Sequence, residues 1–296
     1  MKIGVILPAS EGDGGGRIPP WPAIRSFARA AEDRGLDSVW MFDHFYYRDD
    51  AGEVDGQHEA WTIVSAVAAV TERVEIGTLV LCASFRNPGL TAKMAVTADA
   101  VSDGRLILGL GAGWHDPEYD AFGFPRDRRV DRFEEAMRVV APLVRGERVT
   151  FEGRYERAVE AEIVPAPTRR IPILIACRRP RMLRLTARYA DAFNTAWYGA
   201  PDHRLTEQLG ALDAALEAEG RDPASMTKTV GMIARDPGRQ PESDDDRELV
   251  GSVDDLAAAL DAHEALGVDH LILILQPMNE ASLDWLTKAR ELRSGA

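Results

Sequence analysis

The sequence predicts a closed (β/α)₈ TIM barrel of the α/β class, on three observations. Eight apolar runs rich in Val, Ile and Leu recur along the chain, and each is followed by a segment with the period of an amphipathic helix. The runs are continuously apolar, as is typical of parallel strands that are covered on both faces. No linker or change in composition divides residues 1–296, so we expect a single barrel domain. A doubly wound open sheet is the alternative.

The eight strands are expected near residues 3–7, 38–42, 75–81, 106–110, 172–176, 191–196, 228–234 and 270–275. The longest gap separates the fourth strand from the fifth. It begins with a helix that places Phe133, Met137 and Val140 on one face. Residues 147–169 follow, and we expect them to form a small hairpin inserted between strands four and five. A polar stretch, residues 236–248, follows strand seven and is expected to be a loop, with a lid as the alternative.

An Asp stands at the link from helix to strand in three places. Gly35-Leu36-Asp37 is repeated as Gly267-Val268-Asp269, and Asp191 precedes a third strand in the same way. Glycine commonly ends a helix. These carboxylates fall at the amino ends of strands, where barrel residues serve stability, so we expect all three to lie outside the active site.

The charge balance excludes two classes of partner. A net charge of -13 disfavours nucleic acid and anionic membranes, which bind basic surfaces. No apolar run reaches the roughly 18 residues that span a bilayer. Two cysteines in a chain of this length favour a reduced, cytoplasmic protein. We therefore expect a small-molecule substrate.

In a barrel, the residues that follow each strand form the site. Asp43 and His44 follow strand two, and an imidazole beside a carboxylate is suited to general acid/base chemistry. The alternative is a histidine that only makes structural hydrogen bonds. No histidine spacing matches a metal site, so no metal is expected.

Strand four ends in LILGLGAGWHD, residues 106–116, where glycine takes every second position three times. The spacing does not match a dinucleotide-binding fingerprint. Two interpretations stay open: close packing inside the barrel, or a flat ring lying against bare backbone with Trp114 as one wall.

Strand five ends in Cys177-Arg178-Arg179-Pro180. Proline suits the first position of a helix, so the two arginines stand at a helix N-terminus with free backbone N–H groups, a ready phosphate site. The alternative is two solvated arginines. Neither Cys82 nor Cys177 has an identifiable base partner, which argues against nucleophilic catalysis.

Five blocks in fixed order, residues 37–45, 58–88, 102–125, 127–137 and 180–197, together resemble the bacterial luciferase-like family of flavin and deazaflavin oxidoreductases. The resemblance implies an enzyme, often a homodimer, whose barrel mouth holds the 8-hydroxy-5-deazaflavin coenzyme F420 or, alternatively, FMN. It also implies a non-proline cis peptide at Leu79–Val80, behind the ring.

The resemblance assigns roles to particular positions. His44 becomes the catalytic acid/base, oriented by Asp43. The cofactor-binding residues are Asp43, Leu79, Val80, Cys82, Ala112, Gly113, Ala176, Cys177, Arg178 and Arg179. The substrate pocket is formed by Tyr46, Trp114, His115 and Trp197.

Two positions depart from the family's pattern. Ala176 to Arg179 stand where many relatives have a glycine-rich phosphate loop, and the arginines could supply charge in place of backbone access. Trp114 stands where some deazaflavin dehydrogenases have an acidic proton donor, which argues against a sugar-phosphate dehydrogenase.

Three functions are compared. The favoured one is hydride transfer between reduced deazaflavin and a small, partly apolar organic molecule. The alternative is an FMN-dependent monooxygenase that uses molecular oxygen. A non-catalytic coenzyme-binding barrel would instead have its pocket filled around Tyr46, Trp114 and Trp197.

Overall fold

The computed structural model describes residues 1–235 and 247–294. Hydrogen-bonded parallel neighbours run in the order β10, β11, β12, β14, β1, β2, β5, β7, and pairing of β10 with β7 closes the barrel. The eight strands are β1 (Lys2–Ile6), β2 (Ser38–Met41), β5 (Glu75–Thr78), β7 (Leu106–Gly111), β10 (Ile173–Ala176), β11 (Ala192–Tyr198), β12 (Thr227–Arg235) and β14 (His270–Gln276). The closed (β/α)₈ barrel and all eight expected strands are confirmed.

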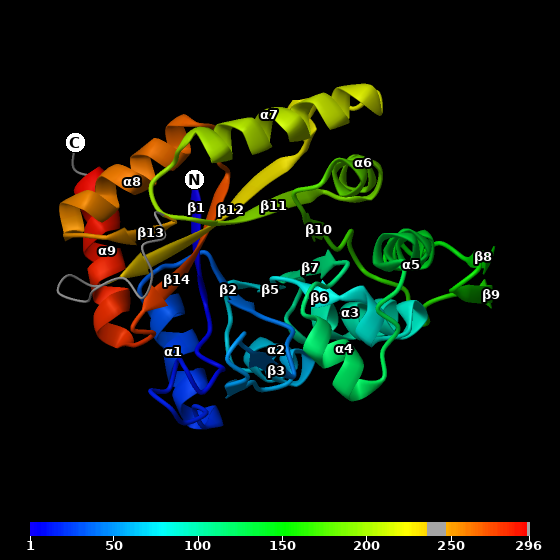
Figure 1. Ribbon diagram of the computed structural model, residues 1–296, viewed down its shortest axis with the longest axis horizontal. Coiled ribbons are helices and arrows are strands. Elements are labelled where there is room, and N and C mark those ends of the chain that lie inside the picture. The colour runs from blue at the N-terminus through cyan, green and yellow to red at the C-terminus, as the bar shows by residue number, and fades with distance from the viewer. Residues whose placement is uncertain (236–246, 295–296) are drawn as a thin grey trace.

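Helices surround the strands (Figure 1). They are α1 (Trp21–Asp33), α2 (Ala60–Ala68), α3 (Pro88–Val101), α4 (Asp116–Phe122), α5 (Arg129–Leu143), α6 (Pro180–Tyr189), α7 (His203–Ala218), α8 (Val253–Ala265) and α9 (Glu280–Ser294), with 3-10 turns η1 (Ala83–Phe85) and η2 (Pro223–Ser225). Each amphipathic helix buries its apolar face. In α5, Phe133, Met137 and Val140 are buried against the barrel, as their spacing predicts.

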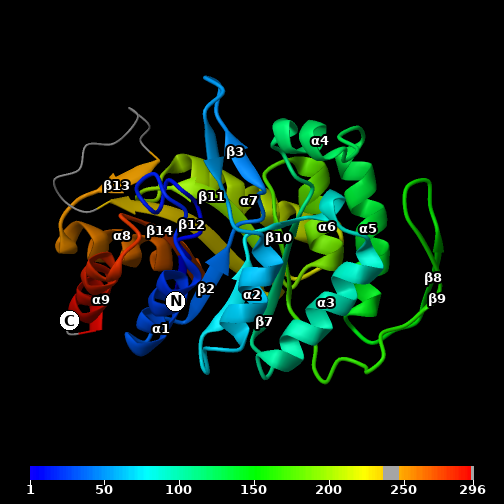
Figure 2. The same ribbon diagram turned by 90° about the horizontal axis from the view of Figure 1, so that it is seen from below.

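The segment between β7 and β10 contains a hairpin, β8 (Val149–Glu152) paired antiparallel with β9 (Arg157–Ala161). The hairpin extends outward beyond α5, away from the barrel (Figures 1 and 2). A second hairpin, β3 (Tyr46–Arg48) with β4 (Val54–Gly56), follows β2. It projects at the same end of the molecule as α4 (Figure 2). Two short strands, β6 (Leu81–Cys82) and β13 (Glu248–Val250), extend the sheet beside β7 and β12.

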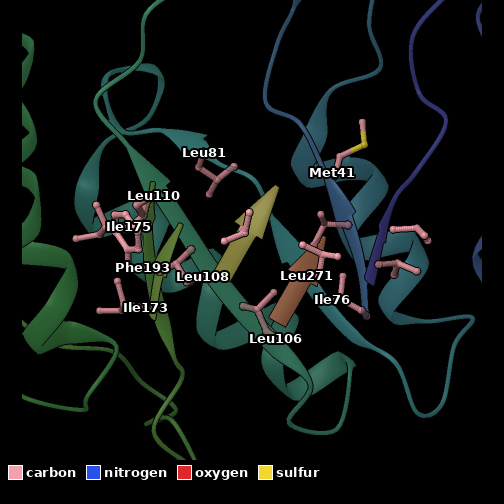
Figure 3. Packing of buried hydrophobic residues seen from close by; sticks show 14 of the residues in the cluster. Met41, Ile76, Leu81, Leu106, Leu108, Leu110, Ile173, Ile175, Phe193 and Leu271 are labelled. Atoms are coloured by element: carbon pink, nitrogen blue, oxygen red, sulfur yellow. The ribbon is translucent and has the colours of Figure 1, made fainter. Parts of the chain in front are cut away.

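Side chains alternate across each strand, so the barrel has two apolar layers. Leu106, Leu108 and Leu110 of β7 belong to the cluster that packs between strands and helices (Figure 3). Ile107 points the other way and packs inside the barrel. By the same alternation, Gly109 and Gly111 face the interior.

The chain between β5 and β6 explains those two glycines. A cis peptide joins Leu79 to Val80, as expected, and the segment passes close over β7. A Cβ atom on Gly109 would lie 1.8 Å from the Thr78 carbonyl oxygen, and one on Gly111 would lie 2.6 Å from Val80 Cγ2. The packing interpretation therefore holds at Gly109. Gly111 is packed against Val80 and also lines the large cavity at the carboxyl ends of the strands, so a ring that lies against its backbone stays a prediction.

Three carboxylates tie the amino ends of neighbouring strands together. The backbone N–H of Ile3 donates to Asp37 at 2.7 Å, that of Ile173 to Asp191 at 3.0 Å, and that of Lys228 to Asp269 at 2.8 Å. None of the three carboxylates lines the large cavity at the carboxyl ends of the strands. All three lie at the amino ends of the strands, where the sequence places them.

The polar stretch after strand seven lies mostly in residues 236–246, outside the described residues. Within residues 1–235 and 247–294, every helix is too short or too polar to span a bilayer.

Candidate active site

A cavity of about 910 Å³ opens at the carboxyl ends of the strands, where barrel enzymes carry out their chemistry. Its size falls within the range of roughly 300–1,000 Å³ typical of cofactor and ligand sites. The expected site residues that line it are Asp43, His44, Leu79, Val80, Cys82, Ala112, Gly113, Trp114, His115, Ala176, Cys177, Arg178, Arg179 and Trp197. The chain therefore brings together positions that are spread over more than half of its length.

Tyr46 is the expected site residue that does not line this cavity. Its hydroxyl donates to the Pro117 carbonyl at 3.1 Å, on the side of β3 that faces α4. Tyr47 lines the cavity instead. Successive side chains of a strand point to opposite faces, so Tyr46 and Tyr47 lie on opposite sides of β3, and it is Tyr47 that faces the cavity. The assignment of Tyr46 to the substrate pocket is wrong.

His44 is held by Glu118, which the sequence analysis did not identify. The Nδ1 atom of His44 lies 2.8 Å from Glu118 Oε2, and the Glu118 side chain is 1% exposed. The other carboxylate oxygen of Glu118 accepts from the Phe45 backbone N–H at 2.5 Å. The expectation that Asp43 orients His44 is wrong, because α4 brings a second acid to the end of β2.

Asp43 instead belongs to a buried ion pair. Both of its oxygens accept from the Arg86 guanidinium, at 2.7 and 2.8 Å, and one also accepts from the Cys82 N–H at 2.9 Å. The same arginine donates to Glu59 at 2.5 Å. Charge-assisted, two-pronged pairs of this kind are among the strongest hydrogen bonds in proteins. Asp43 therefore joins the end of β2 to the segment after β5, next to the cavity.

Aromatic rings form the outer wall of the cavity. The Trp114 ring centroid lies 5.7 Å from that of His44, and the Trp114 side chain is 61% exposed at the mouth. Tyr47 stacks on His115 at 4.8 Å. The Nε2 atom of His115 accepts from the Arg48 N–H at 3.0 Å, and burial lowers the pKa of His115, so this ring is neutral. That leaves His44 as the histidine suited to proton transfer.

The two thiols are poor nucleophiles. Burial raises the pKa of Cys82 and of Cys177 to about 11, so both are protonated at neutral pH. Cys82 Sγ lies 2.9 Å from the Tyr119 hydroxyl, and Cys177 Sγ lies 3.3 Å from Thr186 Oγ1. Both thiols contribute small, uncharged surface to the cavity wall.

The opposite end of the cavity is basic. Arg179 is the N-cap of α6, and no side chain caps that helix, so its first backbone N–H groups are available to a ligand. In the described part of the chain, neither Arg178 nor Arg179 has a carboxylate partner. Free N–H groups at a helix N-terminus together with two cations fit a phosphate. The cavity thus combines apolar walls, the His44–Glu118 pair and a basic end that suits a phosphate. This combination fits a flavin-type ring with its phosphate arm.

This fold and site define a barrel enzyme with a cofactor-sized mouth. The model of the luciferase-like monooxygenase family matches residues 1–237. The chain belongs to this family.

Two curated relatives are F420-dependent glucose-6-phosphate dehydrogenases. The protein of Kineococcus radiotolerans is 36% identical over 212 residues, which cover 70% of this chain and 62% of that one. The protein of Nakamurella multipartita is 32% identical over 273 residues, which cover 89% and 78%. The match thus spans less than two thirds of the length of the first relative.

The fold is also that of a solved F420-dependent secondary alcohol dehydrogenase in complex with an F420-acetone adduct. The TM-score is 0.81 at 19% identity, and the match covers 99% of this chain and 98% of the other. At this level of identity the likeness concerns the fold.

Proposed function

We propose that this protein is an oxidoreductase that transfers a hydride between the deazaflavin coenzyme F420 and a small organic substrate. The observation that carries the proposal is the His44–Glu118 pair beside a cofactor-sized cavity with a basic end. Relatives that are named for F420-dependent dehydrogenation support this choice of coenzyme.

Different residues of the cavity bind the ring and the phosphate arm of the coenzyme. Leu79, Val80, Ala112 and Gly113 bind the ring, while Arg178 and Arg179 bind its phosphate arm. When bound, the coenzyme supplies the hydride donor or acceptor.

Proton transfer falls to His44. Its Nδ1 is engaged by Glu118, so Nε2 is the atom that exchanges a proton with the substrate. Trp114 and Trp197 restrict water around the reacting atoms and, with Tyr47, give the substrate an apolar surface.

The substrate is, we infer, uncharged and partly apolar. Asp13 and Asp55 line the same cavity on the side of β1 and β4. Burial raises the pKa of Asp13, and the charge of Asp55 adds to that effect. The Asp55 carboxylate would repel a phosphate dianion, which disfavours a sugar phosphate. With F420 bound, a secondary alcohol is expected to be turned over faster than glucose 6-phosphate, and the reverse order would contradict this assignment.

Titration of the purified apoprotein with F420 and, separately, with FMN tests the choice of coenzyme. Saturable binding of F420, with FMN binding more weakly, is expected. Preferential binding of FMN would favour the alternative, a monooxygenase, which should then consume oxygen when FMN is reduced. A non-catalytic coenzyme-binding barrel is disfavoured because Trp114 and Trp197 border an open cavity rather than fill it.

We also propose a cytoplasmic homodimer, on the resemblance to the family. Light scattering of the purified protein measures the assembly directly, and a monomeric mass would contradict it.

A further inference from the structure

A second cavity adjoins the first at the N-terminus of α5. It measures about 350 Å³, and Val130 lines both cavities. We call it the arginine pocket; its other lining residues are Arg126, Arg128, Arg129, Asp131 and Arg181. Four cations around one small cavity are unusual in a chain whose net charge is -13.

Four carboxylates pair with three of these four arginines. Arg126 and Arg129 both pair with Asp116, and Arg126 also pairs with Asp120. Arg181 pairs with Asp131 and with Glu134. These ion pairs fix the positions of three guanidinium groups around the pocket.

Arg128 pairs with no carboxylate of the described residues. Within residues 1–235 and 247–294 its guanidinium has no hydrogen bond or ion pair. It is also the N-cap of α5, a helix that no side chain caps, so the first N–H groups of α5 lack side-chain acceptors. The Nε atom of Arg129 is buried and donates to no acceptor in the same part of the chain. Unpaired donors therefore lie on Arg128, on Arg129 and at the start of α5.

The arginine pocket continues the basic end of the main cavity. Arg179 and Arg181 both belong to the start of α6, with Arg179 lining the main cavity and Arg181 the pocket. Helices α5 and α6 pack side by side (Figure 1), and the first residues of both line the arginine pocket, so the two uncapped N-termini lie next to each other. A ligand whose phosphate rests on Arg178 and Arg179 could extend directly over this surface.

We propose that the arginine pocket binds carboxylates of the glutamate tail that F420 carries beyond its phosphate. The proposal rests on the proposed function, because FMN has no such tail. Guanidinium groups suit carboxylates geometrically, since each can donate two parallel N–H groups to one carboxylate. The tail thus serves as a second anchor, remote from the ring.

The test compares two forms of the coenzyme, one with several glutamates and one that ends at the lactyl phosphate. Binding is measured through the change in deazaflavin fluorescence on titration. The tailed form is expected to bind about tenfold more tightly at low salt, a ratio that corresponds to about 1.4 kcal/mol of binding free energy. The advantage should shrink as salt is added, since exposed charges are screened.

Arg128→Gln tests whether the arginine pocket itself, and not the overall charge of the protein, binds the tail. The variant should weaken binding of the tailed form by about threefold or more, a typical effect of one exposed charge, and leave the tail-free form unchanged. Arg25→Gln, an exposed arginine on α1, is the matched control and should change neither. Equal affinity of the wild-type protein for both forms, or an equal loss for both in Arg128→Gln, overturns the tail assignment alone. If neither form binds, the proposed function fails as well.

Discussion

Oε2 of Glu118 lies 2.8 Å from Nδ1 of His44. Helix α4, which follows the fourth barrel strand, β7, therefore holds the imidazole that follows the second barrel strand, β2. The acid is almost fully buried, whereas the side chain of His44 is 21% exposed toward the cavity. A carboxylate at Nδ1 fixes the orientation of the ring and leaves Nε2 to face a ligand. This arrangement gives the proposed acid/base a defined position before any substrate binds.

Replacement of His44 by alanine tests its role directly. His44→Ala should lower kcat by about 10²–10⁴-fold, the range that general acid/base catalysis contributes. Coenzyme affinity should be retained, because Leu79, Ala112 and the arginines of the cavity are unchanged. Fluorescence titration and steady-state kinetics separate the two effects. Turnover equal to that of the wild type would remove His44 from the mechanism.

Glu118→Gln tests the orientation of that imidazole. The amide keeps the size of the side chain but loses its charge, so we expect kcat to fall by about tenfold, less than in His44→Ala. The KM for the coenzyme should stay constant. Asp120→Asn removes an exposed acid from the same helix and should leave kcat unchanged. Equal losses in the two variants would mean that α4 acts through its overall charge and not through the pair with His44.

The barrel could be predicted from the sequence because its signals are local. Eight apolar runs, the helical spacing between them and the Gly-x-Asp links each report on neighbouring residues. The end of every strand then marks one face of the barrel, so nearly all the expected site residues do line the cavity.

Pairing between those residues could not be predicted in the same way. Asp43 and His44 are adjacent in sequence, yet one pairs with Arg86 and the other with Glu118. The partners depend on how η1 and α4 fold over the mouth, which no periodicity encodes. Tyr46 and Tyr47 differ by one position on β3, and only the register of that hairpin decides which one faces the cavity.

Arg86→Leu tests the buried ion pair with Asp43. The side chains of Arg86 and Asp43 are 9% and 2% exposed, so removal of the cation leaves an uncompensated buried carboxylate. The free energy of unfolding should fall by about 3–5 kcal/mol. Adding Asp43→Asn should restore part of this loss, as measured by denaturant unfolding. A double variant that is less stable than Arg86→Leu would contradict this explanation.

The glycines of β7 can be compared with a glycine in open space. A Cβ on Gly109 would lie 1.8 Å from a backbone oxygen, whereas one on Gly210 of α7 would meet no atom within 4 Å. Gly109→Ala should lower the free energy of unfolding by about 3 kcal/mol, through a backbone shift. Gly210→Ala should raise it by about 0.5–1 kcal/mol, because alanine favours the helix. Thermal unfolding of both variants measures these changes. A Gly109→Ala variant as stable as the wild type would mean that the backbone at Thr78 shifts without cost, contrary to the prediction.

His270 makes stability depend on pH. Its Nε2 lies 2.7 Å from Ser38 Oγ in the barrel, and burial, with smaller contributions from the charges of Lys2 and the N-terminal amine, lowers its pKa to about 3. In the unfolded chain a histidine titrates near pH 6.5, at about its ordinary value. Between these two values the unfolded state binds a proton that the folded state does not. Stability must therefore fall as the pH falls from about 6.5 towards 3.

His270 can contribute at most about 1.4 kcal/mol per pH unit to the slope of the unfolding free energy against pH. Carboxylates also titrate in this range, so the measurement is the difference between two curves. The unfolding free energy of the wild type and of His270→Gln is followed by urea denaturation from pH 7.5 to 4.5. The glutamine variant should lose less stability over this interval, whatever its stability at pH 7.5. His203→Gln, at an exposed position on α7, should retain the wild-type slope. Parallel curves for the wild type and His270→Gln would show that the folded state accepts a proton at His270, contrary to its burial beside Ser38.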